Sequence, residues 1–273
     1  MLASGYGLVE GPTAASDGSL YFSDVLGGGV YRRSPAGDVE TVVPKRRGVG
    51  GLALHAEGGI VCSGRDLVHV RDGDTRLVLH VDGVAGWNDL CTDSSGRVYA
   101  GSLRFAVFDP DAPPVPGELW RVDTTGRASE CYGGIVHANG VALAPDERTV
   151  YHSDTRARAV LVHDLDGDGR VYGRRTIDTS GWGAPDGMAV DEAGAIWVAL
   201  LGGFGVGRLA PDGTLDRRVE VPATTVTSVC FAGDDRRDLV VVTADNTDNP
   251  ALRGCVLRTR VDLAGAPVHP ARV

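Results

Sequence analysis

The chain lacks the features that mark nucleic-acid-binding and membrane-spanning proteins. Its formal net charge is −9, from 27 Lys and Arg against 36 Asp and Glu, and it has no basic stripe to neutralise nucleic-acid phosphates. No apolar segment approaches the roughly 20 residues that a membrane-spanning helix needs, and no signal-peptide h-region follows Met1. We therefore expect a cytoplasmic protein without nucleic-acid or membrane partners.

Several catalytic and metal-binding motifs are also missing. The five cysteines are odd in number and scattered, and no CxxC pair occurs, which favours buried, reduced thiols over a disulfide framework. The sequence has no GxSxG nucleophile elbow and no Gly-rich phosphate loop followed by a helix. These absences disfavour serine hydrolases and nucleotide-dependent enzymes.

Short β-like runs and turn signals are abundant instead. The 39 glycines cluster with Asp and Pro between apolar runs, as in Asp17-Gly18 and Asp72-Gly73, where tight β-turns need residues that tolerate positive φ. The runs between them, such as LYFSDV, TVYHSD and AIWVALL, are rich in Val, Leu, Thr and Tyr, and a helical period of 3.6 is hard to find. The pattern predicts an all-β protein.

A repeat organises these runs. Three stretches beginning NDL, NGV and DGM each continue with an apolar run, an Asp in a turn context and a second β-like run, and three further stretches align with them. The first positions of the six units are Glu10, Gly50, Asn88, Asn139, Asp186 and Thr227. Their spacings of 40, 38, 51, 47 and 41 residues predict one domain over 1–273, a six-bladed β-propeller with four-stranded blades around a central channel.

The two ends of the chain are expected to meet in the last blade. Its strands are predicted at Leu239–Ala244 and Cys255–Val261, and Leu2–Leu8 can add a strand beside them, which would leave no free sheet edge. The same blade carries a polar loop that either lines the pocket rim or is solvated. That loop contains Asp245, Asn246, Asp248 and Asn249.

The first positions of the repeat stay polar where the rest is apolar. Equivalent residues of successive blades return to the same mouth of the channel, so they form a ring of two carboxylates, two carboxamides, one hydroxyl and one glycine. Oxygen donors without a thiol suit a hard divalent cation, which would also offset the repulsion between Glu10 and Asp186. The alternative is that these side chains cap strand ends through hydrogen bonds to the backbone.

A second acidic motif, DLDGDG at 164–169, begins like a calcium-binding loop. The EF-hand pattern requires Glu at its twelfth position, which is Arg175 here when counted from Asp164. The motif is therefore predicted to form a hairpin turn within a blade.

Taken in order, the motifs resemble the gluconolactonase/regucalcin (senescence-marker-protein) family from about Leu8 to Leu257. The matching pieces are EGP at 10–12, LYFSD at 20–24, NDL at 88–90, NGVALAPD at 139–146 and PDGMAVDEAGAIWVA at 185–199. The resemblance implies a six-bladed propeller that binds a divalent metal in its channel and hydrolyses sugar lactones or other small esters.

Residue by residue, the resemblance implies that Glu10, Asn139 and Asp186 ligate the metal. Asp186 would also be the general base, and Asn88 would be a ligand or a substrate contact. Ca²⁺ is the expected cofactor, with Zn²⁺, Mg²⁺, Mn²⁺ and Fe²⁺ as alternatives.

One departure from the family concerns the substrate pocket. Many sugar lactonases carry an Arg two residues before the Asn of NDL, and this position is Gly86 here. The loss removes up to five hydrogen-bond donors and favours a less polar lactone or another ester-like electrophile. Arg104 either reaches the pocket from a neighbouring strand end or lies on the surface.

Three further side chains are candidates near the ring. His137, two residues before Asn139, is a candidate substrate contact on the same side of an extended strand. Trp87 and Trp182 flank ring positions and either form an apolar wall over the substrate or seal blade junctions.

The sequence thus predicts a divalent-metal-dependent hydrolase that opens a lactone or related ester, as a monomer or weak homo-oligomer. A metal-dependent isomerase or cyclase that does not hydrolyse its substrate remains an alternative, since the arginine is missing. A non-catalytic binding scaffold is a third, because fold alone does not fix function.

Overall fold

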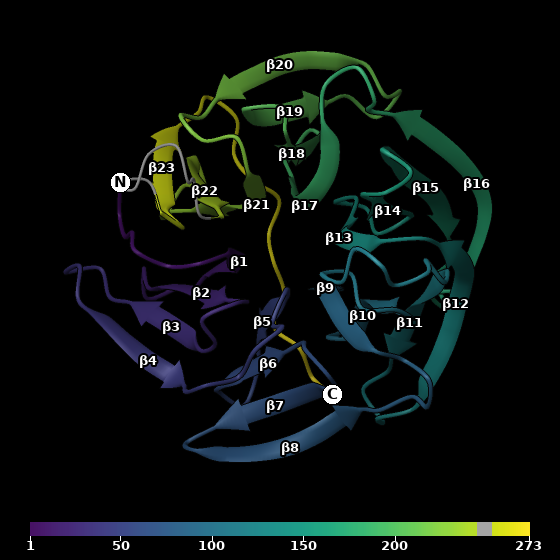
Figure 1. Ribbon diagram of the computed structural model, residues 1–273, viewed down its shortest axis with the longest axis horizontal. Helices are drawn as coiled ribbons and strands as arrows, with labels where there is room; N and C mark the ends of the chain where they lie inside the picture. The colour runs from purple at the N-terminus through teal and green to yellow at the C-terminus, as the bar shows by residue number, and fades with distance from the viewer. Residues whose placement is uncertain (245–252) are drawn as a thin grey trace.

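The computed structural model describes residues 1–244 and 253–273 (Figure 1). The predicted polar loop with Asp245, Asn246, Asp248 and Asn249 lies outside the described residues. The strands form sheets arranged as blades around a central channel, with the first strand of each blade innermost (Figure 1).

The strands of each blade follow one another in chain order and pair antiparallel. Blade 1 contains β1 (Val9–Ala14), β2 (Leu20–Asp24), β3 (Val30–Arg33) and β4 (Val39–Val43). Blade 2 contains β5 (Leu52–Leu54), β6 (Ile60–Cys62), β7 (Leu67–Arg71) and β8 (Asp74–Leu79). Blade 3 contains β9 (Gly86–Thr92), β10 (Val98–Leu103), β11 (Gly117–Val122) and β12 (Ala128–Ile135). Blade 4 contains β13 (Ala138–Leu143), β14 (Thr149–Asp154), β15 (Ala159–Leu165) and β16 (Val171–Asp178). Blade 5 contains β17 (Ala184–Val190), β18 (Ile196–Leu201), β19 (Gly205–Leu209) and β20 (Leu215–Glu220). Blade 6 contains β21 (Val226–Ala232), β22 (Asp238–Thr243) and β23 (Val256–Arg260).

The N-terminal segment completes blade 6, as the sequence predicts. The backbone N–H of Leu2 donates to the carbonyl of Val256 at 2.7 Å, and the N–H of Val256 donates to the carbonyl of Ala3 at 2.9 Å. Leu8 forms a second antiparallel bridge, to Ala244. The start of the chain thus covers the outer edge of β23 and closes the ring of blades.

The aspartates of the repeat build its hairpin turns. Asp93, Asp123 and Asp191 each accept hydrogen bonds from the backbone N–H groups two and four residues later. Asp166 does the same between β15 and β16, which confirms that the DLDGDG motif at 164–169 is a hairpin turn. A carboxylate that satisfies turn amides explains why the repeat needs Asp there.

The hydrophobic core is divided among the blade junctions. Each of six buried clusters lies between two adjacent blades, and the one between blades 2 and 3 also contains Ala271 and Val273 of the C-terminal segment. All five cysteines are free thiols, as the sequence predicts. In the part of the chain that is described, no helix is long and apolar enough to cross a membrane.

The C-terminal segment was not anticipated from the sequence. After β23 it crosses the centre of the propeller toward blades 2 and 3 (Figure 1). The N–H of Ala266 donates to the carbonyl of Val190 in blade 5 at 2.9 Å, and that of Ala271 donates to the carbonyl of Leu54 in blade 2 at 2.8 Å. The segment therefore ties together blades that are not neighbours in sequence.

Candidate functional site

The ring positions lie at irregularities of the innermost strands. The pairing register shifts between Ala138 and Val141 in blade 4 and between Pro185 and Met188 in blade 5, where the inner strand has one extra residue. A similar shift follows Glu10 in blade 1. Such β-bulges re-aim side chains, and here they fall where the repeat places its polar residues.

Glycines beside the ring let neighbouring inner strands come into contact. A Cβ on Gly140 would lie 2.4 Å from the carbonyl oxygen of Asp186, and one on Gly50 would lie 2.0 Å from Oδ1 of Asn88. Both distances are too short for any side chain. The Asn88 amide therefore occupies the space that a side chain at position 50 would need.

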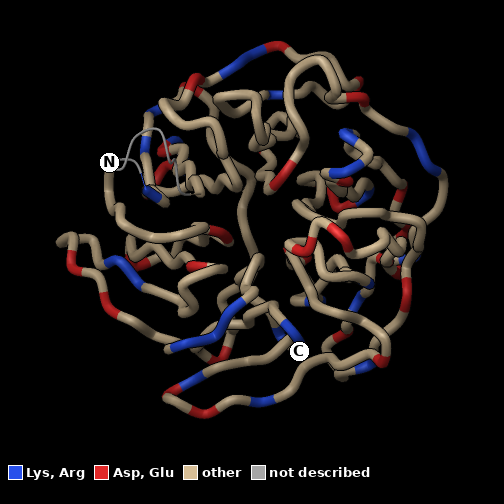
Figure 2. The backbone as a smooth tube through the Cα atoms, in the orientation of Figure 1, with Lys and Arg blue, Asp and Glu red and all other residues tan. Residues whose placement is uncertain are grey.

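Five of the six ring residues, all except Gly50, line one cavity. Its volume is about 590 Å³, and it is bounded by inner strands of several blades. Its walls include every site residue predicted from the sequence, namely Glu10, Trp87, Asn88, His137, Asn139 and Asp186, together with Thr227. Figure 2 shows acidic positions (red) on inner strands at the centre of the molecule. The structure thus brings together residues that are up to 217 positions apart in the sequence, from Glu10 to Thr227.

The amide side chains are held by their nitrogens. Nδ2 of Asn139 donates to Oγ1 of Thr155 at 3.2 Å, and Nδ2 of Asn88 donates to the carbonyl of Ala138 at 3.0 Å. Their amide oxygens therefore remain available as acceptors or ligands. The Thr227 hydroxyl instead donates to a backbone carbonyl of β1 at 2.6 Å, in agreement with the strand-capping alternative for this position.

Two buried carboxyl groups belong to this cavity. Burial raises the pKa of Glu10 well above its usual range, and the charges of Asp186 and Asp89 raise it further. Burial also raises the pKa of Asp186, with a second contribution from Asp89. Oδ1 of Asp186 is buried without a hydrogen-bond partner. Glu10 accepts a hydrogen bond from the N–H of Gly11 at 3.3 Å, but among the described residues neither carboxylate pairs with the cationic side chain that a buried charge requires.

The third carboxyl group, Asp89, was missed by the sequence reasoning. Asp89 is buried, and burial raises its pKa to about 7. Its Oδ1 accepts a hydrogen bond from the backbone N–H of Leu90 at 2.8 Å. It lines a second cavity of about 590 Å³, which the C-terminal segment also borders. The sequence does contain a signal at the second position of the repeat. Four of the units have Gly there and another has Ser228, whereas this unit has a carboxyl group.

The donor set fits a hard divalent cation better than a soft one. Glu10 and Asp186 offer carboxylate oxygens and Asn139 offers an amide oxygen, while no thiol lines this cavity. Among the described residues, no group of three or more His, Cys, Asp or Glu side chains is arranged to hold a metal, so the amide is an essential part of the set. The unpartnered Asp186 oxygen is the observation that favours a cation here.

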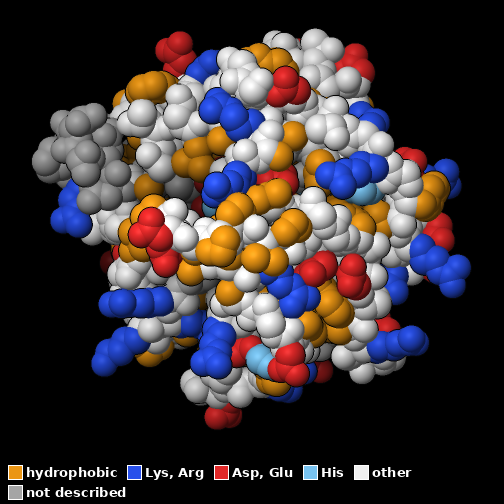
Figure 3. All heavy atoms as spheres, turned by 45° about the vertical axis from the view of Figure 1, so that its right-hand side comes forward, with side chains coloured by type: hydrophobic (Ala, Val, Ile, Leu, Met, Phe, Trp, Pro, Cys, Tyr) orange, Lys and Arg blue, Asp and Glu red, His pale blue; other side chains and the backbone are white. Residues whose placement is uncertain are grey.

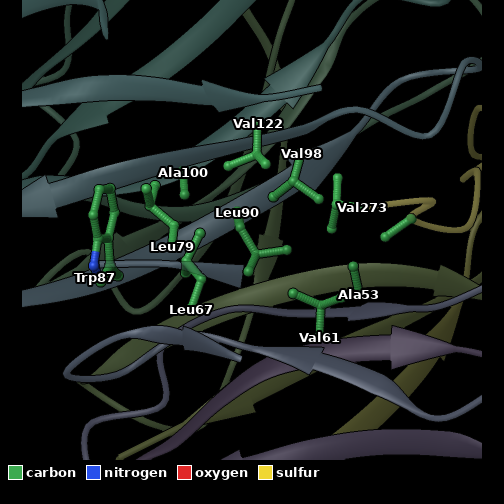
Figure 4. Packing of buried hydrophobic residues seen from close by; sticks show 11 residues of the cluster. Ala53, Val61, Leu67, Leu79, Trp87, Leu90, Val98, Ala100, Val122 and Val273 are labelled. Atoms are coloured by element: carbon green, nitrogen blue, oxygen red, sulfur yellow. The ribbon is translucent and has the colours of Figure 1, made fainter. Parts of the chain in front are cut away.

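Trp87 forms an apolar wall of the cavity and also packs in the core. It is 1% exposed and lies in the cluster between blades 2 and 3, near Leu67 and Leu79 (Figure 4). Its ring meets Trp120 edge to face, with centroids 6.4 Å apart. Trp182 does not line the cavity and packs against the cluster between blades 4 and 5, so it is a junction residue and not a lid.

The structure places His137 at the cavity and Arg104 away from it. His137 lines the cavity, burial lowers its pKa, and its backbone N–H donates to Oδ1 of Asp154 at 3.2 Å. Arg104 does not line the cavity, because its guanidinium pairs with Glu118 at 3.0 Å. Arg104 therefore does not supply the donors missing at Gly86.

A known protein family matches most of the chain. The model of the SMP-30/gluconolactonase/LRE-like region matches residues 8–245. The chain belongs to this family. The resemblance inferred from the EGP, NDL, NGVALAPD and PDGMAVD motifs is thereby confirmed.

Curated members of the SMP-30/gluconolactonase family align over most of the chain. A 6-deoxy-6-sulfogluconolactonase of Pseudomonas putida is 34% identical over 263 residues, which cover 90% of this chain and 88% of the relative. The pentonolactonase XacC of Haloferax volcanii is 33% identical over 245 residues, which cover 87% and 81%.

Solved structures confirm the six-bladed propeller. A luciferin-regenerating enzyme superposes with a TM-score of 0.85 at 23% identity, covering 98% of this chain and 97% of its own. A calcium-binding protein, regucalcin, from Agrobacterium tumefaciens superposes with a TM-score of 0.85 at 22% identity, covering 100% and 96%. At these identities the likeness concerns the fold alone.

Proposed function

We propose that this protein is a divalent-metal-dependent lactonase that opens the ring of a sugar-derived lactone. The observation that carries the proposal is the buried, uncompensated pair Glu10 and Asp186, placed with Asn139 at the floor of a cavity of about 590 Å³. Two family members named as sugar lactonases, each at least 33% identical over most of the chain, support the reaction class.

Glu10, Asn139 and Asp186 would hold the cation, with Asn88 beside them. The family includes a solved structure described as a calcium-binding protein, so Ca²⁺ is the first candidate. When bound, a divalent cation supplies a Lewis acid that polarises a carbonyl oxygen.

The chain's own residues would carry the proton. Asp186 accepts a proton from a water molecule as the water oxygen bonds to the lactone carbonyl carbon. The bond between this carbon and the ring oxygen then breaks, and the proton passes to the departing ring oxygen, which leaves a hydroxy acid. Burial suits Asp186 to this role, because it raises the proton affinity of the carboxylate.

The other walls would position the substrate. Asn88 lies in the cavity wall, and Trp87 offers an apolar face that excludes water from one side of the ring. His137 lies at the same cavity and is kept neutral by burial, so it would donate or accept one hydrogen bond.

The deciding experiment is metal reconstitution. The protein is stripped with a chelator, each divalent cation is added back, and hydrolysis of sugar and non-sugar γ- and δ-lactones is followed by acid release. The proposal expects turnover that depends on added metal and is fastest for a sugar lactone. Metal-independent turnover would contradict the role of the cation, and tight metal binding without turnover of any lactone would contradict the reaction.

A further inference from the structure

The mouth of the cavity has two chemically different sides. The segment between β10 and β11 supplies an apolar side with Phe105, Val107 and the largely exposed Phe108. A neighbouring part of the wall, from the segments before β5 and before β7, carries Arg47 and Arg65. In Figure 3, hydrophobic side chains gather across the middle of the face, with Lys or Arg side chains beside them.

Arg47 lies on the segment that links β4 of blade 1 to β5 of blade 2, and Arg65 lies on the loop between β6 and β7; hydrogen bonds join these two segments. Arg46, which precedes Arg47, donates from Nε to the carbonyl of Ser63 at 3.0 Å and from Nη2 to the carbonyl of Asp66 at 2.7 Å. A Cβ on Gly64 would lie 3.4 Å from the carbonyl oxygen of Arg47. The loop that carries Arg47 is thus locked against the loop that carries Arg65.

This pair of loops is also joined to the cavity wall. The N–H of Trp87 donates to the carbonyl of Gly64 at 2.6 Å, and the N–H of Gly64 donates to the carbonyl of Trp87 at 3.2 Å. A Cβ on Gly86 would lie 3.5 Å from the same Gly64 carbonyl oxygen. The backbone of Arg65, which follows Gly64, therefore lies next to the space that a side chain at position 86 would occupy.

In the part of the chain that the structure describes, neither guanidinium is neutralised. Over residues 1–244 and 253–273, the side chains of Arg47 and Arg65 form no ion pair or hydrogen bond. By contrast, Arg97 and Arg208 pair with buried aspartates elsewhere. Two unpaired cations on one wall of a cavity, in a chain with a net charge of −9, favour an anionic ligand group there.

We propose that Arg47 and Arg65 form an anion-binding subsite, and that the substrate is a lactone with a carboxylate, sulfonate or phosphate on its tail. This inference rests on the proposed lactonase function. The lactone ring lies on the floor near Asp186, while the charged tail reaches the guanidinium groups at the mouth. Because the tail is bound equally in ground and transition states, the subsite acts mainly on KM.

The kinetic test compares three lactones with metal-loaded enzyme. Glucarolactone carries a carboxylate, phosphogluconolactone carries a phosphate, and gluconolactone is neutral. The double variant Arg47→Gln/Arg65→Gln is expected to lose about tenfold or more in kcat/KM for the anionic lactone that the enzyme prefers, mainly through KM, and to keep its activity on gluconolactone. The preferred anionic lactone distinguishes a carboxylate tail from a phosphate tail.

Two further variants control for charge and for geometry. The double variant Arg127→Gln/Arg170→Gln makes the same change of charge on exposed turns between β11 and β12 and between β15 and β16, outside the cavity, and should leave the preference unchanged. The double lysine variant Arg47→Lys/Arg65→Lys should restore part of the preference, because it keeps the charges but not the planar forks. An equal loss on neutral and anionic lactones, or an unchanged preference in the glutamine variant, would overturn the subsite.

A binding measurement separates this inference from the reaction itself. Calorimetry compares glucarate, a dicarboxylate, with gluconate, a monocarboxylate, and needs no turnover. Wild-type protein should bind glucarate more tightly by about tenfold, and the glutamine double variant should lose this difference. If no lactone is hydrolysed but the binding difference behaves in this way, the lactonase proposal fails and the subsite stands. If the two acids bind alike, the subsite is wrong.

Discussion

At the scale of single residues, the site buries a carboxyl group that does not stabilise the fold. Asp186 is 3% exposed, one of its oxygens has no hydrogen-bond partner, and burial and Asp89 raise its pKa. An ionised carboxylate in such a position destabilises the metal-free fold at neutral pH, because its folded pKa lies above its unfolded value. Function, and not stability, explains why Asp occupies this position.

The substitution Asp186→Asn separates these two effects. It keeps the shape and one oxygen but removes the charge, so lactone hydrolysis should be lost while the Tm of the metal-free protein rises by about 3 °C. Acid-release assays and thermal unfolding in chelator measure the two outcomes. Asp111→Asn, on an exposed loop, should change neither. Near-wild-type turnover in Asp186→Asn would refute both the base and the ligand role.

Glu10→Gln tests the other charged ligand. The amide keeps an oxygen donor in β1 but removes a negative charge, so metal affinity should fall by about tenfold or more before the fold is affected. Calorimetric titration with Ca²⁺ gives the affinity, and thermal unfolding in chelator checks the fold. An unchanged affinity would remove Glu10 from the ligand set.

At the scale of elements, turn aspartates also serve the core. Asp191 is fully buried and accepts hydrogen bonds from Nε1 of Trp197 at 2.9 Å and from Nε of Arg208 at 2.7 Å. Asp216 also pairs with Arg208, but its side chain is 41% exposed. One residue of the repeat therefore forms the β17–β18 turn and neutralises a buried guanidinium of β19.

Asp191→Ala should consequently be costly. It leaves the Arg208 charge without its buried partner, for a loss of about 3–5 kcal/mol in the free energy of unfolding. Asp216→Ala removes the exposed partner of the same arginine and should cost about 1 kcal/mol or less. Urea unfolding of the two variants side by side measures the difference. Equal losses would show that burial of the pair is not what matters.

The repeat allowed most strands and turns to be predicted, whereas contacts between neighbouring blades could not be predicted from it. The apolar alternation and the Asp-containing turns are local features, so the blades and the DLDGDG hairpin could be read from the sequence. Asp89 was missed, and the choice between the two roles of Trp182 stayed open, because the surroundings of both side chains come from neighbouring blades. Whether Asp89 faces Asp186 or solvent depends on how closely inner strands approach, and that depends on glycines such as Gly51 and Gly140 in other units.

At the scale of the whole molecule, closure depends on both chain ends. Pairing of Leu2 and Ala3 with Val256 was predictable, since blade 6 otherwise leaves an open edge. The path of residues 264–273 was not, because this segment has no β periodicity and contains Pro267 and Pro270. Its contacts are backbone hydrogen bonds to distant blades, hydrogen bonds that its carbonyls accept from side chains such as His55 and Thr92, and the packing of Ala271 and Val273 between blades 2 and 3. A sequence carries no local signal for such contacts.

Removal of residues 266–273 should therefore weaken the propeller without disabling its site. The deletion abolishes the hydrogen bonds to Val190 and Leu54, and it uncovers the second cavity, which contains Asp89. None of these residues lines the cavity that holds Glu10 and Asp186. The Tm should fall by several degrees, while kcat/KM per folded molecule at low temperature stays within about twofold of wild type. Val268→Ala, at a side chain 77% exposed, provides the control within the same segment and should leave Tm unchanged. If the deletion instead removed activity at full stability, the second cavity would be part of the catalytic machinery, and the assignment of the C-terminal segment to stability alone would be wrong.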